Sequence, residues 1–390
     1  MPDLEDVTFL LPGPVKLHPR VLRALSLPSM PHRSPEFTAA LGHLTEGLKE
    51  VFGTFQDVTV LSGSGTAGME AAVGSLVKKG DRVVALSNGK FGERMADISA
   101  LHGDAVRVTA PWGQGFDLGE VERALKGGET KALTFVLNET STGVMNQGKE
   151  IAWLAREHGA LVIMDAVTAV GSVPVPVDEW GVDVCIVGSQ KCLAAPPGLA
   201  FLSVSEEAYS RLHRFSYYLD LKKHIDKTRA GSTPFTPAVP LYLAATEAIR
   251  IALEEGLDAR YERTRRMADA TRAAATALGL ELYAAEDVRS DTVTAIRYPD
   301  VPDAEKAIRG RMKDAHGVLV AGGQDEVKGR IFRIGHMANA RPEELAGCFH
   351  ALESCLIEAG HDFVPGAGTG ALVRAFSRAP DAAVASGRSA

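Results

Sequence analysis

The chain has 390 residues, of which 45% are hydrophobic and 23% charged, a balance that is ordinary for a globular protein with a substantial core. Its formal net charge of −7 disfavours a nucleic-acid partner, because such partners favour a basic surface. The first ten residues are acidic, and no apolar run reaches the roughly 18 residues that a membrane span needs. The four cysteines form no CxxC pair, so we expect a cytoplasmic protein with reduced cysteines, no metal site and no membrane contact.

Short apolar runs alternate with helical patterns from residue 58 to residue 212. The sequence predicts strands at 58–61, 82–86, 105–109, 132–137, 161–165, 184–187 and 199–204. It predicts helices at 67–79, 92–101, 118–125, 149–158 and 206–212. Strands that alternate with helices indicate an α/β layer, so we expect a mostly parallel seven-stranded sheet covered by helices.

The second part of the chain has a different pattern. A helical stretch over 238–278 is expected to break near Gly256, and short strands are expected at 280–283, 292–298, 318–320 and 331–334. A helix over 342–359 follows, so this part resembles a smaller α+β domain. We therefore expect an N-terminal arm at 1–20, a large domain at 21–255 and a small domain at 256–365. The Ala-, Gly- and Ser-rich tail at 366–390 is expected to be disordered.

The segment LSGSGTAG at 61–68 follows a predicted strand and begins a predicted helix. Gly63, Gly65 and Gly68 match the dinucleotide pattern G-x-G-x-x-G, but the next strand ends in Ser87 and Asn88 without the carboxylate that holds a ribose. Backbone N–H groups at the start of a helix still suit a single phosphate. A tight turn without a ligand is the alternative.

Two further strands end in residues with reactive side chains. The strand at 161–165 ends in Asp165, which could bind a metal, act as a base, pair with a cationic ring or cap a helix. The strand at 184–187 leads into Gly188 and then Lys191. A partly desolvated lysine there would have a lowered pKa and would attack an aldehyde, whereas the alternative is a solvated loop lysine.

A phosphate-binding turn, a carboxylate and a lysine, in this order on one sheet, are the three anchors that pyridoxal phosphate needs. The turn would bind the phosphate, Asp165 would keep the pyridine nitrogen protonated, and Lys191 would form the Schiff base with the aldehyde. The combination therefore favours a pyridoxal-phosphate enzyme over the separate alternatives.

The chain also resembles the class V, fold-type I aminotransferases, in particular the alanine–glyoxylate and serine–pyruvate group. The resemblance covers about residues 8–360. It is carried by LPGP at 11–14, SGSGT at 62–66, NGKFG at 88–92, ETSTGV at 139–144, the strand that ends in Asp165, GSQK at 188–191, APPG at 195–198 and FRIG at 332–335. It implies the fold-type I architecture, with a large domain that binds pyridoxal phosphate and a smaller C-terminal domain.

The resemblance also implies roles for single residues. Lys191 would be the catalytic lysine and proton shuttle, and Asp165 would pair with the ring nitrogen. Phe91 and Val167 would pack on the two ring faces. Gly65, Thr66 and Ala67 would offer N–H groups to the phosphate, with help from Gln190. Thr140 would contact the ring hydroxyl.

Thr236 would reach the phosphate in the neighbouring subunit of a homodimer. Arg333 would bind the substrate α-carboxylate, although a surface ion pair is the alternative, and the loop at Gly13 would cover the substrate.

The segment HRSPEF at 32–37 leaves the amino donor open. Arg33 could recognise a second acid group, as in aspartate or phosphoserine, or could be a structural ion-pair partner. The expected reaction is ping-pong transamination from a small L-amino acid, alanine or serine, to a 2-oxo acid such as glyoxylate or pyruvate. The alternatives are an acidic donor (aspartate, phosphoserine or an aminophosphonate), a cysteine desulfurase or lyase, an NAD-dependent dehydrogenase, and a binding protein without activity.

Overall fold

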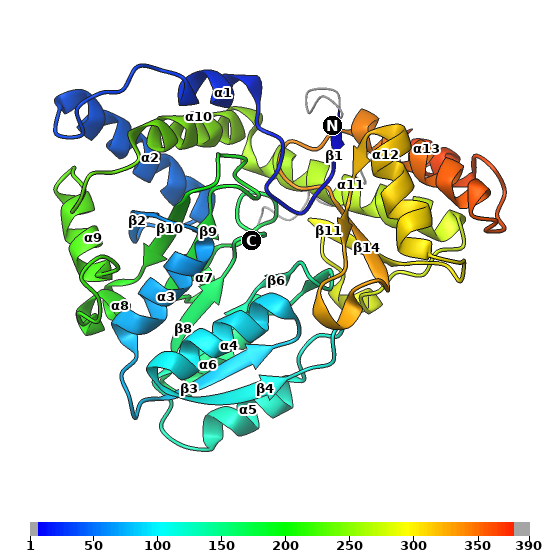
Figure 1. The fold of residues 1–390 in the computed structure, drawn as a ribbon. Coiled ribbons are helices and arrows are strands. Elements are labelled where there is room, and N and C mark those ends of the chain that lie inside the picture. The colour runs from blue at the N-terminus through cyan, green and yellow to red at the C-terminus, as the bar shows by residue number, and fades with distance from the viewer. Residues whose placement is uncertain (1–6, 378–390) are drawn as a thin grey trace, which may run out of the picture.

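The computed structural model describes residues 7–377, and a seven-stranded sheet lies at the centre of its larger part (Figure 1). The strand order is β2-β10-β9-β8-β5-β3-β4. The bounds are β2 Asp57–Ser62, β10 Leu199–Val204, β9 Val184–Gly188, β8 Leu161–Asp165, β5 Ala132–Val136, β3 Arg82–Ser87 and β4 Asp104–Thr109. Strand β10 runs in the opposite direction to the other six strands of this sheet. The expectation of a mostly parallel seven-stranded sheet is therefore confirmed.

Helices cover both faces of this sheet because the central strands are apolar on both sides. On β8, Val162 and Met164 pack with one set of helices, while Leu161 and Ile163 pack with the other. The first face carries α2 Pro35–Phe52, α5 Leu118–Lys126, α6 Gly148–Glu157 and α10 Val239–Glu255. The opposite face carries α3 Gly65–Leu76, α4 Lys90–His102 and α9 Leu221–Arg229. Shorter elements of this part are α1 Pro19–Leu25, α7 Val177–Trp180, α8 Glu206–Arg211 and the hairpin β6 Asn138–Glu139 with β7 Val144–Met145.

The smaller part contains a three-stranded antiparallel sheet in the order β11-β14-β13. Its strands are β11 Val293–Arg297, β13 Ala321–Gly322 and β14 Ile331–Gly335. Its helices are α11 Leu257–Ala277, the π-helix η2 Glu305–Gly310, α12 Arg311–His316, α13 Pro342–Glu358 and α14 Ala367–Ser377, with short 3₁₀ turns η1 Glu286–Val288 and η3 Asp325–Val327. A second apolar core holds these elements together. Gly256, at φ 85°, separates α10 from α11 as expected.

The N-terminal segment crosses between the two parts (Figure 1). Strand β1, Thr8–Phe9, pairs in parallel with β12, Val318–Leu319. The chain then passes close to Gly335, whose N–H donates to the Leu10 carbonyl at 2.8 Å and where a Cβ would lie 2.5 Å from the Leu11 oxygen. This contact requires glycine at 335, and it directs the LPGP segment toward the carboxyl edge of the large sheet.

The structure differs from the sequence-based expectations at several places. Residues 280–283 form no strand and make only an isolated bridge between Leu282 and Ile296. The expectation of disorder from residue 366 is wrong for Ala367–Ser377, because Leu372 of α14 is buried in the second core and Gly368 lies against Leu278. Residues 378–390 of that tail lie outside the described part. Helix α2 was not expected, although Ser34 caps it and Pro35 occupies its first position.

Buried Arg260 on α11 ties the smaller part to the loop that follows β9. Its guanidinium donates to the carbonyls of Gly171 at 2.7 Å and Cys192 at 2.8 Å, and it pairs with Glu255 at 2.8 Å.

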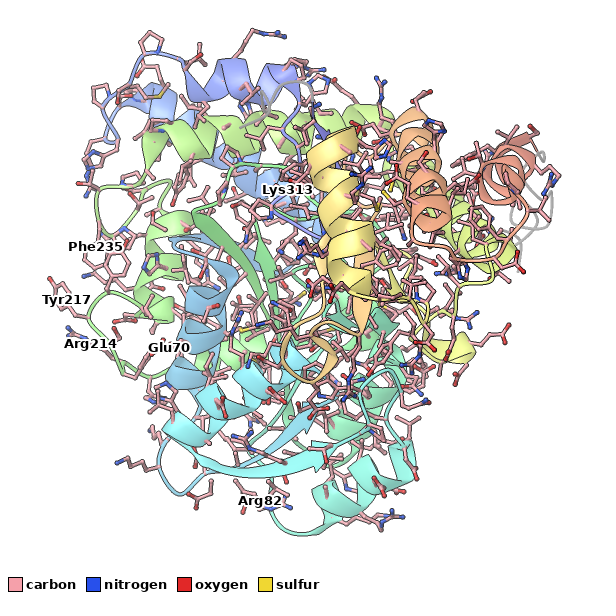
Figure 2. The ribbon with its side chains drawn as sticks, turned by 45° about the vertical axis from the view of Figure 1, so that its right-hand side comes forward. Glu70, Arg82, Arg214, Tyr217, Phe235 and Lys313 are labelled. Carbon is pink, nitrogen blue, oxygen red and sulfur yellow. The ribbon has the colours of Figure 1, made fainter. Side chains whose placement is uncertain are left out.

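The loop between α9 and α10 lies at the outer edge of the molecule. Phe235 of this loop packs against Tyr217, with ring centroids 5.7 Å apart (Figure 2).

Candidate active site

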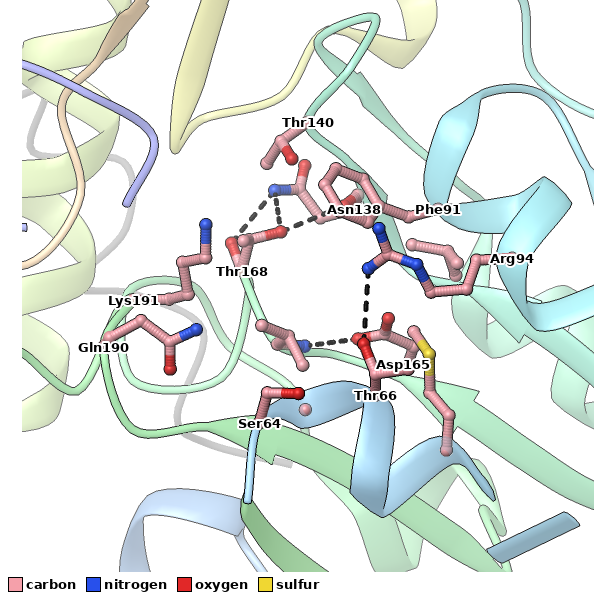
Figure 3. Close-up of a pocket in the computed structure, with 14 residues that line it drawn as sticks. Ser64, Thr66, Phe91, Arg94, Asn138, Thr140, Asp165, Thr168, Gln190 and Lys191 are labelled. Atoms are coloured by element: carbon pink, nitrogen blue, oxygen red, sulfur yellow. Dashed lines mark hydrogen bonds between the residues drawn. The ribbon is translucent and has the colours of Figure 1, made fainter. Parts of the chain in front are cut away.

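A cavity of about 190 Å³ opens where β2, β5, β8 and β9 end (Figure 3). This is the carboxyl edge of the sheet, where ligands of open α/β folds bind. The residues that were predicted from the sequence and that line it are Gly65, Thr66, Phe91, Thr140, Asp165, Val167, Gln190 and Lys191. The fold thus brings together residues from five separate segments of the chain.

The start of α3 forms one end of the cavity. Ser64 is the N-cap but makes no side-chain capping bond, and its carbonyl accepts from the Ala67 N–H at 2.8 Å. Within residues 7–377, the N–H groups of Gly65 and Thr66 have no acceptor. Two free N–H groups at the positive end of a helix suit an anionic oxygen. Ala67 differs from the expectation, since its N–H is already used and it does not line the cavity.

Asp165 is a buried carboxylate on the wall of the cavity. Its Oδ1 accepts from the Val167 N–H at 2.8 Å, whereas Oδ2 has no hydrogen-bond partner among the described residues. Burial raises the pKa of Asp165 to about 7, against the lowering effect of the Val167 N–H and of the charges on Arg94 and Lys191. A cation beside Oδ2 would favour the ionised form. No group of three or more His, Cys, Asp or Glu side chains within residues 7–377 is arranged to hold a metal ion.

Lys191 follows β9 and points into the cavity (Figure 3). Its Nζ donates to the Pro12 carbonyl at 2.8 Å and to the Gly13 carbonyl at 3.2 Å, and it makes no ion pair within the described chain. Burial is the main reason why the pKa of Lys191 falls to about 8. Gly13 has φ +94°, and a Cβ there would lie 2.1 Å from Lys191 Cδ, so only glycine fits. The alternative of a solvated loop lysine is therefore wrong.

Glu139 organises the opposite wall, and sequence analysis assigned it no role. This fully buried carboxylate accepts from the N–H groups of Phe91 and Gly92 at 2.9 Å each, and from the Ser141 N–H at 3.1 Å and hydroxyl at 2.5 Å. It therefore fixes the first turn of α4, which carries the Phe91 ring. Gly89 permits this approach, because a Cβ there would lie 2.4 Å from Glu139 Cγ.

Arg333 on β14 lies behind Thr140 and is only 6% exposed. It donates from Nη1 to the Thr140 carbonyl at 2.8 Å, and from Nε and Nη2 to the Gly322 carbonyl at 3.0 and 2.7 Å. It makes no ion pair with a described carboxylate, so a surface ion pair is excluded. Three of the five guanidinium N–H groups are used, which leaves one on each Nη for a carboxylate.

Two predicted residues, Arg33 and Thr236, are exposed and do not line the cavity of their own chain. Arg33 donates to the Ser232 hydroxyl at 2.8 Å and is 3.4 Å from the Thr233 carbonyl. Thr236 follows Phe235 at the outer edge of the molecule (Figure 2). Arg33 and Thr236 thus lie on two loops that are in contact at the surface.

Sequence analysis missed several residues of the cavity wall: Ser64, Met69, Arg94, Val136, Asn138 and Thr168. The spacing along α4 could have indicated Arg94, because residues three apart share a helix face. Its guanidinium lies 5.0 Å from the Phe91 ring centroid and 3.4 Å from the Thr66 hydroxyl. The other five carry no signal beyond their proximity to the predicted segments.

The free groups of the cavity match pyridoxal phosphate. The unpaired N–H groups of Gly65 and Thr66 suit its phosphate, the free Oδ2 of Asp165 suits a protonated ring nitrogen, and the Lys191 amine suits its aldehyde. The dinucleotide alternative has no such support. It would need a free carboxylate after β3 to bind a ribose, but Asn88 stands there, and its side-chain N–H₂ group donates to the Gln114 carbonyl and to the Asn146 side chain. The residues present therefore fit this cofactor.

Comparison with known proteins identifies the family that the sequence resembles, the class V aminotransferases. Residues 21–327 match the model of the class V aminotransferases. An uncharacterized aminotransferase of Methanocaldococcus jannaschii is 41% identical, over 91% of this chain and 94% of its own. A serine–glyoxylate aminotransferase of Methylorubrum extorquens is 36% identical, over 93% of this chain and 94% of its own.

The names of similar proteins are not uniform. A protein of a Synechococcus species that is named as the small subunit of a soluble hydrogenase is 42% identical, over 96% of this chain and 100% of its own. Among solved structures, ureidoglycine–glyoxylate aminotransferase from Bacillus subtilis superposes with a TM-score of 0.91 at 31% identity, over 95% of this chain and 98% of its own.

The lowered pKa of Lys191 leads to a pH prediction. Only the neutral amine attacks an aldehyde, so the rate at which cofactor-free protein takes up pyridoxal phosphate should rise with pH to a midpoint of about 8. An ordinary lysine would give a midpoint near ~10.4. Stopped-flow absorbance measures the rate, and Lys191→Ala is the control, which should lack the phase. A rate that rises only above pH ~10 would contradict the desolvated lysine.

The contacts of Glu139 lead to a second prediction. Glu139→Gln places an amide N–H₂ against backbone N–H donors, which should weaken pyridoxal-phosphate binding about tenfold and alter the visible circular dichroism of the bound ring. The matched control is Glu93→Gln on the same helix, where the half-exposed carboxylate only approaches Lys90 at 3.7 Å. Equal affinities and spectra for the two variants would show that Glu139 does not position Phe91.

Proposed function

Because the chain belongs to the class V aminotransferases, and is therefore a pyridoxal-phosphate-dependent transaminase, we propose that it moves the amino group of a small L-amino acid to a 2-oxo acid. Serine or alanine is the proposed donor, and glyoxylate or pyruvate the acceptor. The observation that carries the proposal is one cavity that holds the Lys191 amine, the Asp165 carboxylate and two free N–H groups of α3. The names of the relatives from Methylorubrum and Bacillus support glyoxylate as the acceptor.

The proposed mechanism assigns one task to each residue. When it is bound, pyridoxal phosphate supplies an electron-withdrawing ring that stabilises negative charge at the substrate Cα. Asp165 keeps the ring nitrogen protonated through its free Oδ2, and Phe91 packs on the ring. Lys191 Nζ takes the Cα proton and later returns it, which its lowered pKa of about 8 makes efficient near neutral pH.

Arg333 is proposed to bind the α-carboxylate common to both substrates. Its buried guanidinium donates to the carbonyls of Thr140 and Gly322, and burial lowers its pKa to about 10 against the opposing effect of the Glu139 charge. A carboxylate that accepts from the two free N–H groups would give Arg333 the direct ion pair that it lacks within the described residues. Since Arg333 also contacts Thr140, the carboxylate would lie at the Thr140 end of the cavity, away from the start of α3.

The desulfurase alternative gains no support from the cysteines. Cys192 and Cys348 are fully buried, and burial raises their pKa values to about 11 and about 12. Cys192 Sγ lies 3.8 Å from the sulfur of Met337, outside the cavity wall. All four cysteines are buried and free, which agrees with the proposed cytoplasmic location.

Acidic donors remain the second candidate because of Arg33. Its hydrogen bonds with Ser232 and Thr233 link it to the loop of Thr236. If Thr236 lies near the active site of a neighbouring subunit, the Arg33 guanidinium also lies near that site, because Arg33 contacts the same loop. A homodimer with shared sites is therefore part of the proposal.

The donor is tested by visible absorption of the cofactor-loaded protein with single amino acids and no acceptor. Serine or alanine should bleach the band, and glyoxylate or pyruvate should restore it. Bleaching by aspartate or phosphoserine alone would shift the proposal to an acidic donor and to Arg33. A band that no amino acid changes would reject transamination of these donors.

The shared site is tested by mixing two inactive or weakened variants. Lys191→Ala cannot form the Schiff base with the cofactor, and Thr236→Ala should bind the cofactor less tightly if Thr236 acts across a dimer. In a mixed dimer, the intact Lys191 of one chain would meet the intact Thr236 of the other, so a class of sites with unchanged affinity should reappear. Sedimentation establishes the dimer, and no recovery in a demonstrated mixed dimer would place Thr236 outside the partner's site.

A further inference from the structure

Asn138 of β6 is a cavity residue to which neither the sequence nor the proposed mechanism assigns a role. It is 2% exposed and lines the cavity together with Thr140 and Thr168. Figure 3 shows its amide beside Thr140 and Thr168, on the side of the Lys191 amine and opposite Ser64 and Thr66. In the proposed function, this is the end of the cavity that binds the substrate.

The orientation of the Asn138 amide is fixed by its nitrogen. Its two N–H groups are shared among three acceptors: the Thr168 carbonyl at 2.9 Å, the Thr168 hydroxyl at 2.9 Å and the Thr292 hydroxyl at 2.7 Å. A carbonyl oxygen can only accept, so the atom that faces it must be the N–H₂ group. The Thr168 hydroxyl donates its own proton to the main-chain carbonyl of Asn138 at 2.9 Å, so it can only accept from Nδ2.

The other amide atom has no such partner. Oδ1 of Asn138 is buried and accepts no hydrogen bond from the described residues. A buried acceptor without a donor is unfavourable, and nearly all such groups in folded proteins are paired. Because Nδ2 points to Thr168 and Thr292, Oδ1 is directed away from them. Asn138 lines the cavity, so a molecule that occupies the cavity is an available source of a donor.

We propose that Asn138 Oδ1 is a specificity determinant that accepts a hydrogen bond from the side-chain hydroxyl of a serine donor. This rests on the proposed function and names its preferred substrate. Alanine has no side-chain donor to offer, and the side-chain carboxylate of aspartate would bring acceptor against acceptor. Sites that hydrogen-bond a substrate hydroxyl discriminate against analogues that lack it, since their own buried group is then left unpaired.

The experiment compares serine and alanine in two variants of the cofactor-loaded enzyme. Asn138→Ala removes Oδ1, and kcat/KM for serine should fall about tenfold relative to alanine. The matched control is Thr292→Val, which removes one acceptor of Nδ2 but leaves Oδ1 in place, outside the cavity wall. It should change kcat/KM for both donors by the same factor. The serine concentration that half-bleaches the cofactor band without an acceptor should rise only for Asn138→Ala.

An unchanged serine-to-alanine ratio in Asn138→Ala would overturn the proposal. So would a shift of the cofactor band or of its pH titration without any amino acid, because Oδ1 would then face the cofactor. If Asn138→Ala does not fold, as thermal unfolding shows, Asn138→Ser provides the same comparison with a side chain too short to replace Oδ1. Failure of the proposed function is distinguishable, since no amino acid would then bleach the unmodified enzyme.

Discussion

The burial of the Lys191 amine among backbone carbonyls is the constraint on which the rest of the site depends. Nζ lies at the carboxyl edge of the sheet with the carbonyls of Pro12 and Gly13 as its protein partners, and it has no carboxylate in the described chain to form an ion pair with. This environment favours the neutral amine, which is the form that reacts with an aldehyde. It also requires the N-terminal segment to come within contact of Lys191, and Gly13 and Gly335 permit that approach.

Further buried charges with incomplete partners lie in and beside the cavity. Asp165 has one free oxygen, and Arg333 has two free N–H groups. The turn at Glu139 and Ser141 links two parts of the site. Glu139 fixes the first turn of α4, and the Thr140 carbonyl accepts from Arg333. A substrate that brings a carboxylate and a cofactor that brings a cationic ring would complete both sets of contacts. The unfavourable burial of charge in the free protein thus becomes binding energy for ligands.

Much of this arrangement could be predicted from the sequence, because strand ends in a parallel sheet converge at one edge. Asp165, Lys191 and the glycine turn are separated along the chain, yet the order of the strands places them around one cavity. The helix at 367–377 could not be predicted from composition, because its stability comes from packing on Leu278 and the second core. Asn138 was missed for a similar reason, since its amide is oriented by Thr168 and Thr292, which are 30 and 154 residues away along the chain. The roles of Arg33 and Thr236 depend on a second subunit, which one chain does not contain.

The central claim is that Lys191 holds the cofactor, and covalent trapping tests it most directly. Borohydride reduction of the protein loaded with pyridoxal phosphate makes the bond to the lysine permanent, and peptide mass analysis then identifies the modified residue. The account predicts a single pyridoxyl-phosphate group on the peptide that contains Lys191, and none on that peptide in Lys191→Ala. A group on another lysine, or no modification of a protein shown to bind the cofactor, would contradict the assignment of this cavity as the active site.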